Sequence, residues 1–166
     1  MERALLVVTF AAAIGTAIVG GMFYAFSSFV MRALGRIAPE QGVAAMNSIN
    51  VAVITPSFMA VFAGTALLCL GLAATSVLSW QQPGSGLALA ASLLYLVGNF
   101  GLTMRLNQPM NLRLAALHPA AALAYWPQYL QAWTMWNHVR TAAAVLAATL
   151  FIAALMRAWL PGAAQQ

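Results

Sequence analysis

Long apolar runs alternate with shorter polar segments along this chain. A helix needs about 20 residues to cross the ~30 Å hydrocarbon core of a bilayer. The long runs are rich in Ala and Leu and lack the alternation of apolar and polar positions that is typical of membrane strands. The pattern therefore predicts an all-α fold, an integral membrane four-helix bundle. Its expected spans are about residues 4–31, 51–80, 86–106 and 138–160.

The segments that connect these spans differ in length and polarity. The second and third spans are joined by a short turn of Gln, Pro, Gly and Ser, whereas residues 32–50 and 107–137 form long polar connections. In a bundle of four spans, the first and third connections lie at the same membrane face. Most polar side chains are therefore expected at one end of the bundle.

Prolines predict short helical segments in both long connections. Pro39 suits the first position of a helix that leads into the second span, and Pro56 predicts a kink after it. In the other connection, residues 107–109 predict a turn before a short helix. Pro127 then suits the start of the last long helix.

Composition supports a membrane location. Hydrophobic residues make up 63% of the chain and charged residues 5%, with a mean hydropathy of +0.86, whereas an ordinary soluble domain is about a quarter charged. We expect a multi-pass protein of the bacterial inner (plasma) membrane, with residues 1–166 forming one transmembrane domain. The seven arginines form no basic run, so the lipid bilayer, not nucleic acid, is the expected partner.

One helix face in residues 126–140 gathers unusual chemistry. Trp126, Tyr129, Trp133, Asn137 and Arg140 follow each other at spacings of 3, 4, 4 and 3 residues, which places them on the same side of a helix. A snorkelling arginine is the simplest reading of a lone cation at a membrane surface. Because this arginine shares its face with an amide and three aromatic rings, we instead predict one wall of a small-molecule site.

Other polar residues are expected near the same end of the bundle. Asn107 and Asn111 flank Pro109 and place several amide donors close together, while Tyr24 and Asn50 lie near that end of the first span and of the first connection. The structural alternative is that these polar groups only form hydrogen bonds between helices. An interhelical hydrogen bond would by itself explain Asn99 inside the third span. Both readings stay open.

The two histidines, His118 and His138, raise the question of a metal or haem. No HxxxH or ExxH spacing occurs and the single cysteine, Cys69, forms no thiolate cluster, so neither cofactor is expected. Imidazole can act as a general base near neutral pH, which makes His138 a candidate base beside Arg140. The predicted spans contain no Asp, Glu or Lys, which argues against an ion-coupled transporter.

Three motifs occur in order along the chain. They are Tyr24-Ala25-Phe26-Ser27 with Met46-x-x-Ile49-Asn50, then Asn107-x-Pro109-x-Asn111, then Trp133-x-x-Trp136-Asn137-x-x-Arg140-Thr141. Together they resemble the DUF1772 family of four-span membrane proteins, which includes the anthrone oxygenases of fungi and bacteria. The resemblance covers roughly residues 5–155. It implies a four-span bundle and an oxygenase that uses O2 with no metal or flavin.

Such a reaction needs a base, donors for an oxyanion and an apolar slot for rings. We expect His138 as the base, with Arg140 and Asn137 as catalytic donors. The substrate would be a hydrophobic aromatic small molecule, and O2 the co-substrate. The expected substrate-binding residues, which supply further donors and ring contacts, are Asn107, Asn111, Trp133, Trp136, Tyr129, Asn50 and Tyr24, with Phe100 as a further ring contact.

Two other functions remain possible on the sequence. A non-enzymatic bundle that binds a lipid or quinone, or a small accessory subunit, would also present donors and aromatic rings at one membrane face. A haem- or metal-binding bundle is the third alternative. A homo-oligomer is compatible with each of them.

Overall fold

The structure, a computed structural model, describes residues 3–159, and every regular element in that range is helical. Four helices are long and apolar enough to cross a membrane, which confirms the predicted helical membrane bundle. They are Arg3–Leu34, which contains α1 (Arg3–Ala25) and α2 (Met31–Leu34); α4 (Pro56–Leu78); Ser85–Ala116, which contains α5 (Ser85–Tyr95) and α6 (Gln108–Ala116); and α7 (Pro119–Trp159). A shorter helix, α3 (Pro39–Ala52), lies in the first long connection.

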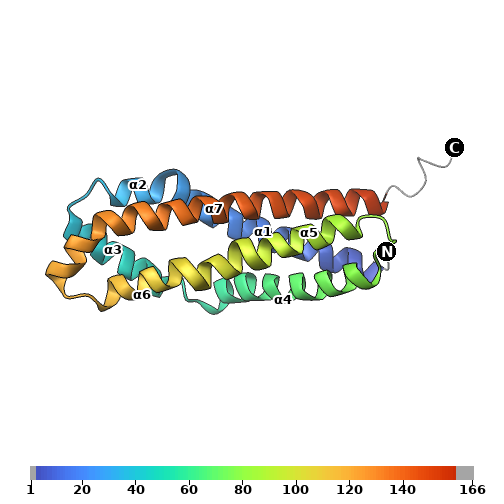
Figure 1. Ribbon diagram of the computed structural model, residues 1–166, viewed down its shortest axis with the longest axis horizontal. Helices are drawn as coiled ribbons and strands as arrows, with labels where there is room; N and C mark the ends of the chain where they lie inside the picture. The colour runs from blue at the N-terminus through green and yellow to red at the C-terminus, as the bar shows by residue number, and fades with distance from the viewer. Residues whose placement is uncertain (1–2, 160–166) are drawn as a thin grey trace.

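The helices form an elongated bundle with two different ends (Figure 1). At one end α1, α4, α5 and α7 lie side by side, and the described chain begins and ends there. At the other end α2, α3, α6 and the first turns of α7 pack together. Both long connections therefore lie at the same end, as predicted, and both contain helical segments.

The helical conformation is interrupted between α3 and α4, where the sequence predicts only a kink. Thr55 is extended (φ −103°, ψ 152°) and its side chain accepts a hydrogen bond from the Phe58 N–H, as an N-cap does. Pro56 lacks an N–H and disfavours a helical conformation at Thr55, so it ends one helix and begins the next.

The predicted turn at residues 107–109 is wrong, because one helix continues from Ser85 to Ala116. Two single turns of π-helix, Leu96–Gly101 and Thr103–Asn107, precede Pro109. In the second of these turns the Gln108 N–H bonds to the Thr103 carbonyl, five residues back. A wider turn changes the hydrogen-bond pattern just before the proline, so the helix tolerates a residue that would otherwise break it.

The last helix begins at Pro119, eight residues earlier than predicted, and contains Pro127 in its interior. Its 41 residues extend roughly 60 Å, about twice the thickness of the hydrocarbon core. Pro127 removes one backbone hydrogen bond, but the neighbouring Trp126 and Tyr129 are buried against α3 and α6. That burial outweighs the lost bond and keeps the helix continuous.

Two hydrophobic cores follow each other along the bundle. The first, which includes Phe23, Phe62 and Tyr95, lies among the four long helices. The second, which includes Met46 and Trp133, lies at the end that contains α3 and α6. The junction of these two cores is where the candidate site lies.

We predict that Gly98→Ala destabilises the bundle. A Cβ at Gly98 would lie 2.6 Å from the Ala143 Cβ, so α7 would have to move away from the helix that carries Gly98. Overpacking of this kind costs about 1–3 kcal/mol, and we expect a lower midpoint of thermal unfolding in detergent.

The matched control is Gly64→Ala, because a Cβ at Gly64 meets nothing within 4 Å. Alanine favours a helix over glycine by about 0.5–1 kcal/mol, so this variant should unfold at the same temperature as wild type or higher. Equal melting temperatures for the two variants would contradict the close approach of the two helices.

Candidate functional site

One face of α7 is buried along its first half. Trp126, Tyr129, Trp133, Asn137 and Arg140 are all buried, which confirms that the spacing in the sequence places them on one side of the helix. The aromatic rings form a continuous row, in which Trp126 stacks on Tyr129 with ring centroids 5.5 Å apart and Tyr129 stacks on Trp133 at 6.4 Å. This row leads from the end of the bundle to Arg140.

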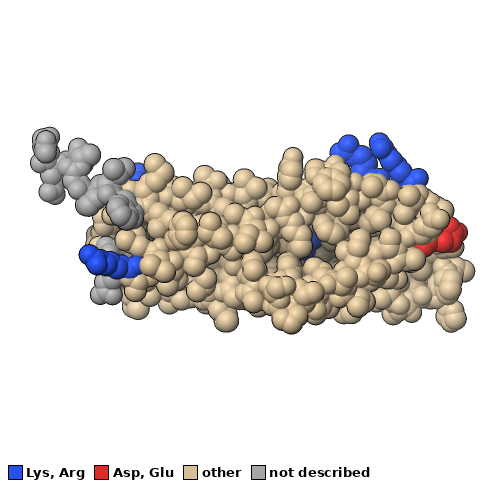
Figure 2. Space-filling view, turned by 180° about the vertical axis from the view of Figure 1, so that it is seen from behind, with Lys and Arg blue, Asp and Glu red and all other residues tan. Residues whose placement is uncertain are grey.

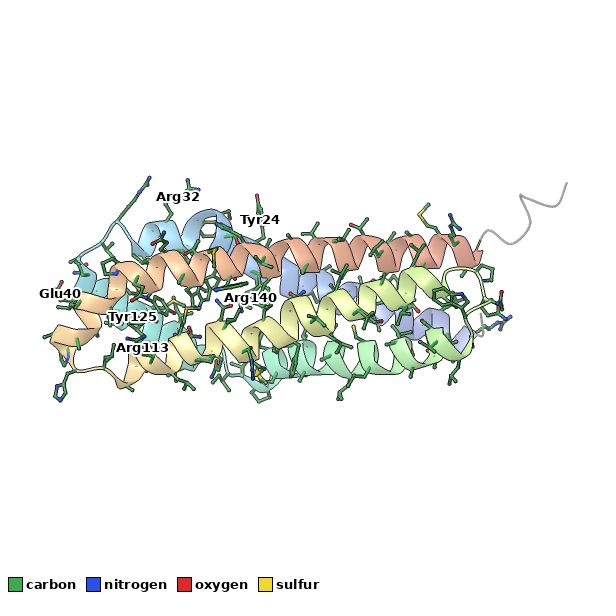
Figure 3. The ribbon with its side chains drawn as sticks, viewed as in Figure 1. Tyr24, Arg32, Glu40, Arg113, Tyr125 and Arg140 are labelled. Carbon is green, nitrogen blue, oxygen red and sulfur yellow. The ribbon has the colours of Figure 1, made fainter. Side chains whose placement is uncertain are left out.

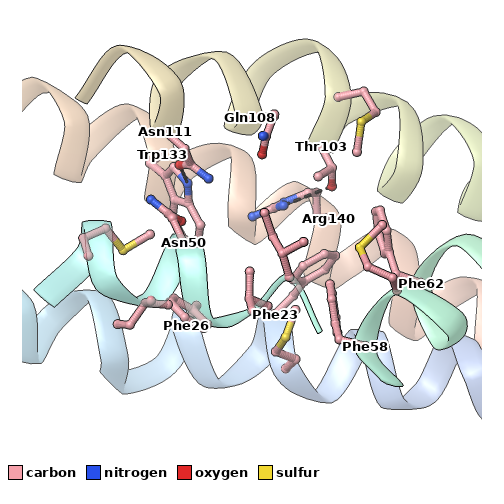
Figure 4. A pocket seen from close by; sticks show the side chains of 17 residues that line it. Phe23, Phe26, Asn50, Phe58, Phe62, Thr103, Gln108, Asn111, Trp133 and Arg140 are labelled. Carbon is pink, nitrogen blue, oxygen red and sulfur yellow. Dashed lines mark hydrogen bonds between the residues drawn. The ribbon is translucent and has the colours of Figure 1, made fainter. Parts of the chain in front are cut away.

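A cavity of about 250 Å³ lies at the junction of the two cores. Figure 4 shows its polar groups on one side, from Asn50 to Arg140, and the rings of Phe58 and Phe62 on the other. It can therefore accept a flat apolar molecule with a polar edge. Its lining residues are Met22, Phe23, Phe26, Met46, Ile49, Asn50, Val53, Ile54, Phe58, Met59, Phe62, Thr103, Met104, Gln108, Asn111, Trp133 and Arg140.

Arg140 is held in place by two side-chain acceptors. Its Nη2 donates to Asn137 Oδ1 (2.7 Å) and its Nη1 donates to Thr103 Oγ1 (3.0 Å). The guanidinium carbon lies 4.1 Å from the centre of the Phe23 ring, a cation–π distance. The Nε–H is buried and has no partner, so the protein satisfies only part of the hydrogen-bonding capacity of this guanidinium.

This cation has no acidic partner in the described range. Arg140 is 3% exposed, whereas Glu40, the one acidic residue in residues 3–159, is exposed at the tip of the bundle (Figure 3). A buried charge without a counter-ion is costly. The site therefore favours a ligand that carries or develops negative charge near Arg140.

Asn137 connects Arg140 to the first long helix. Its Nδ2 donates to the Phe23 carbonyl (2.7 Å) and to Ser27 Oγ (2.8 Å), while its Oδ1 accepts from Arg140. Ser27 also shares a hydrogen bond with Thr141 (2.9 Å). Each polar atom of the Asn137 side chain is thus occupied, which makes Asn137 a positioning residue behind the cavity wall.

Single turns of π-helix occur where helices pass the site. Thr103, which accepts from Arg140, begins the turn Thr103–Asn107, and its Oγ1 also donates to the Asn99 carbonyl (2.7 Å). The Asn99 amide, oriented to satisfy both neighbours, donates to the Arg140 carbonyl and accepts from the Ala144 N–H, each at 3.2 Å. Such turns are frequent at functional sites, and this one aims a hydroxyl at the guanidinium.

A second cluster of polar side chains at the cavity is centred on Asn111. Its Oδ1 accepts from the Tyr129 hydroxyl and from Trp133 Nε1, both at 2.8 Å. Because an indole N–H can only donate, these bonds fix the amide orientation, and its nitrogen turns toward the side of the cavity where Arg140 lies (Figure 4). Asn50 lines the same cavity, and its Nδ2 is buried without a partner.

The structure brings some of the predicted site residues to the cavity and others behind it. Asn50, Asn111, Trp133 and Arg140 line it. Tyr129 and Asn137 stand behind the lining residues that they bond. Asn107 does the same, because its Nδ2 donates to the Trp133 carbonyl (3.2 Å). Phe100, expected as a ring contact, stacks on Phe62 with ring centroids 5.4 Å apart and does not line the cavity.

Three predicted residues lie away from the cavity. Tyr24 and His138 are exposed and line a shallow groove on the outer face, between α1 and α7. Trp136 is half-buried and does not line the cavity. His138 adjoins Asn137 in the sequence, but a step of one residue turns a helix by roughly 100°, so its imidazole points outward.

The sequence pattern does not predict most of the apolar lining of the cavity, nor two of its polar residues, Thr103 and Gln108. Thr103 follows Asn99 by four residues, a helical spacing that could have placed it on the same face. Gln108 was read as part of a turn. Aromatic and Met residues inside spans give no such signal, because they are common in any membrane helix.

No group of three His, Cys, Asp or Glu side chains that could hold a metal ion occurs in residues 3–159. The donors that line the cavity are instead amides, a hydroxyl, an indole N–H and a guanidinium. Groups of this kind bind the oxygen atoms of an organic ligand.

The family model of the anthrone oxygenases matches residues 57–150, a region that contains Thr103, Asn111, Trp133 and Arg140. No curated protein and no solved structure matches the chain. Because the family model covers more than half of the 166 residues, the chain belongs to the anthrone oxygenase family.

Proposed function

We propose that this protein is a membrane oxygenase that oxidises a hydrophobic, oxygen-bearing aromatic compound, of the anthrone kind, with O2. The observation that carries the proposal is the buried Arg140, which lines an apolar cavity, has no acidic partner in residues 3–159 and keeps an unpaired Nε–H. A fixed donor in a site that excludes water stabilises an oxyanion far better than water does. An aromatic ketone that ionises during the reaction would supply that oxyanion.

The size of the cavity supports a ligand with fused rings. An apolar cavity of about 150 Å³ holds one benzene molecule, and pockets for drug-sized ligands begin near 300 Å³. The value of about 250 Å³ found here lies between the two. It favours a compact planar molecule over a lipid chain.

The proposed reaction converts a ring CH2 group into a carbonyl. Loss of a proton gives an enolate, which passes one electron to O2, and the resulting radical pair combines at the same carbon. The peroxide takes up a proton and then loses water to leave C=O. One oxygen atom of O2 stays in the product, and the other leaves as water with the two hydrogens of the CH2 group.

Each part of the cavity has a role in this scheme. The Arg140 guanidinium stabilises the negative charge that grows on the substrate oxygen. Asn111 and Asn50 bind further oxygen substituents at the polar edge. Phe58 and Phe62 contact the rings and exclude water, which strengthens the electrostatic effect of Arg140.

The proton of the CH2 group is assigned to a water molecule inside the cavity, which returns it to the peroxide. None of the 17 lining residues carries a carboxylate or an imidazole, and His138 lies on the outer face. The protein then promotes deprotonation by stabilising the enolate, not by supplying a base. This assignment replaces the general base expected from the sequence.

The substrate itself supplies the electrons, so the proposal needs O2 as co-substrate and no haem, flavin or metal. The proposed partners are a hydrophobic small molecule and the bilayer, with no nucleic acid, and a homo-oligomer is compatible with this. We place the protein in the inner membrane of a bacterium, because apolar helical spans are typical of that membrane and barrels of the outer one.

A second candidate function is the binding of a quinone without turnover. Donors at the polar edge of the cavity would bind a quinone carbonyl as well as an enolate. The two functions differ in whether O2 is consumed, and the first prediction separates them.

We predict that the purified protein in lipid nanodiscs converts 1,8-dihydroxyanthrone to the anthraquinone only when O2 is present. Absorbance should report the quinone, an oxygen electrode should report one O2 per quinone formed, and protein-free nanodiscs should give the background rate. Tight binding of the quinone with no O2-dependent rate above that background would favour the binding function instead.

We predict that Arg140→Lys lowers kcat by roughly 10²-fold, the usual cost of removing an oxyanion donor. Lysine keeps the charge but not the planar fork that contacts Asn137, Thr103 and the substrate together. The variant should still fold, as judged by its yield and thermal unfolding.

The control for this variant is Arg113→Lys. Arg113 is exposed and stacks on the Tyr125 ring at 4.4 Å, outside the cavity. Its kcat should equal that of wild type, and an unchanged kcat in Arg140→Lys would remove Arg140 from the mechanism.

We predict that His138→Gln keeps kcat within about twofold of wild type and leaves the dependence of the rate on pH between 6 and 8 unchanged. The reason is that its imidazole faces away from the cavity. Loss of activity, or loss of a pH-dependent limb near neutral pH, would restore His138 as the base.

A further inference from the structure

The cavity opens through the side of the bundle. Figure 2 shows a hollow partway along the molecule, with basic atoms at its floor and uncharged residues around it. The exposed fractions of the lining residues agree with this view. Arg140 is 3% exposed, whereas Ile54, Met104 and Met59 are 64%, 45% and 38% exposed. We call these three exposed residues the rim, and all of them are apolar.

The rim lies near one boundary of the hydrocarbon core. The 23 residues of α4 extend roughly 35 Å, slightly more than the core of a bilayer. Ile54 and Met59 stand on either side of Pro56, where this helix begins. Met104 lies on the π-helical turn Thr103–Asn107, so two different segments of the chain frame the opening.

Three other walls of the cavity are closed by buried side chains. Toward the end of the bundle that contains α3, Met46 and Trp133 belong to a packed core. Toward the opposite end, Phe62 contacts Tyr95, whose hydroxyl donates to the Phe62 carbonyl (2.9 Å). Behind Phe23, the hydrogen bonds of Asn137 join two helices. The rim holds the most exposed residues of the lining, so it offers a ligand the least obstructed way in.

We propose that the rim is a lateral portal through which an uncharged polycyclic aromatic substrate passes between the bilayer and the cavity. This inference rests on the proposed function, since it assumes that the cavity holds such a molecule. The three apolar side chains of the rim let a neutral ring system pass. They offer no hydrogen bond to a charged or sugar-bearing molecule, which would lose its hydration there. The substrate class is therefore neutral aromatics that dissolve in the membrane, which ionise only after they reach Arg140.

The break between α3 and α4 explains why an opening can exist at this level. Residues 53–55 do not continue the helix, and Ile54 lies in this short segment. Irregular backbone at membrane depth is tolerated where it lines a cavity. Pro56 fixes the break at the rim by ending α-helical hydrogen bonding there.

The first test asks which solvent the rim faces. Cys69 is buried, so a thiol-reactive bimane will label an Ile54→Cys variant in nanodiscs selectively. Quenching by lipids with brominated acyl chains should match that of Leu67→Cys, on the exposed side of α4. Glu40→Cys, at the tip of the bundle, should respond to aqueous iodide instead. If Ile54→Cys behaves like Glu40→Cys, the portal faces water and the proposal fails.

The second test asks whether ligands pass the rim. The probe is 1,8-dihydroxyanthraquinone, the product that the proposed reaction forms from 1,8-dihydroxyanthrone and that does not react further with O2. Stopped-flow quenching of tryptophan fluorescence gives its kon and koff. A portal controls both rates without changing the bound state, so Ile54→Phe should lower kon and koff by the same factor, about fivefold, and leave Kd unchanged. Ile54→Ala should raise both rates together, and Leu67→Phe should change neither.

The outcomes separate the portal from the proposed function. Unchanged rates in Ile54→Phe would place the access route elsewhere, and a changed Kd with constant kon would make Ile54 a ligand contact. Either result overturns the portal while the cavity remains the binding site. Failure of wild type to bind the probe overturns both, whereas equal changes in kon and koff support the portal even if no oxygenation is observed.

Discussion

The burial of Arg140 is the constraint on which the rest of this structure depends. A guanidinium beside two hydrophobic cores must replace the hydration that it loses. Asn137 and Thr103 accept two of its donors, and the Phe23 ring lies against its plane. Each of these partners comes from a different part of the chain, so α1, α7 and the Ser85–Ala116 helix are tied together at one point.

Several irregular features follow from this requirement. Thr103 reaches the guanidinium from a π-helical turn, and the Asn99 amide braces the α7 backbone beside Arg140. Asn137 bonds the Phe23 carbonyl just before another π-helical turn, Phe26–Val30. The helices thus depart from regular geometry at the level where the cation must be satisfied, and remain regular where only apolar side chains meet. The Nε–H stays without a partner, so the protein itself meets only part of this requirement.

The sequence predicts the parts of this arrangement that depend on spacing within one helix. Four apolar runs give the bundle, and the 3-4-4-3 spacing from Trp126 to Arg140 gives the buried face. Prediction from the sequence fails where local conformational preferences compete with tertiary packing. Pro109 and Pro127 signal breaks by their chemistry, yet both lie within continuous helices because π-helical turns and buried aromatic rings compensate for them. The expected place of His138 at the site differs from the structure for another reason. His138 and Arg140 are only two residues apart, and side chains at that spacing lie on different faces of a helix.

The junction of the two cores explains why a polar floor and an apolar rim can coexist in one cavity. Uniform tight binding of the substrate would not speed its oxidation, because only interactions that strengthen as the reaction proceeds lower the barrier. A neutral aromatic passing Ile54 and Met104 meets only apolar contacts, and its oxygen gains a charged partner once it lies beside Arg140. Arg140 then stabilises the developing charge of the enolate more than it stabilises the neutral bound substrate. An acidic residue beside Arg140 would remove this difference by neutralising the cation in advance. Its absence there, in the part of the chain that the structure describes, therefore matters more than the number of donors around the cavity.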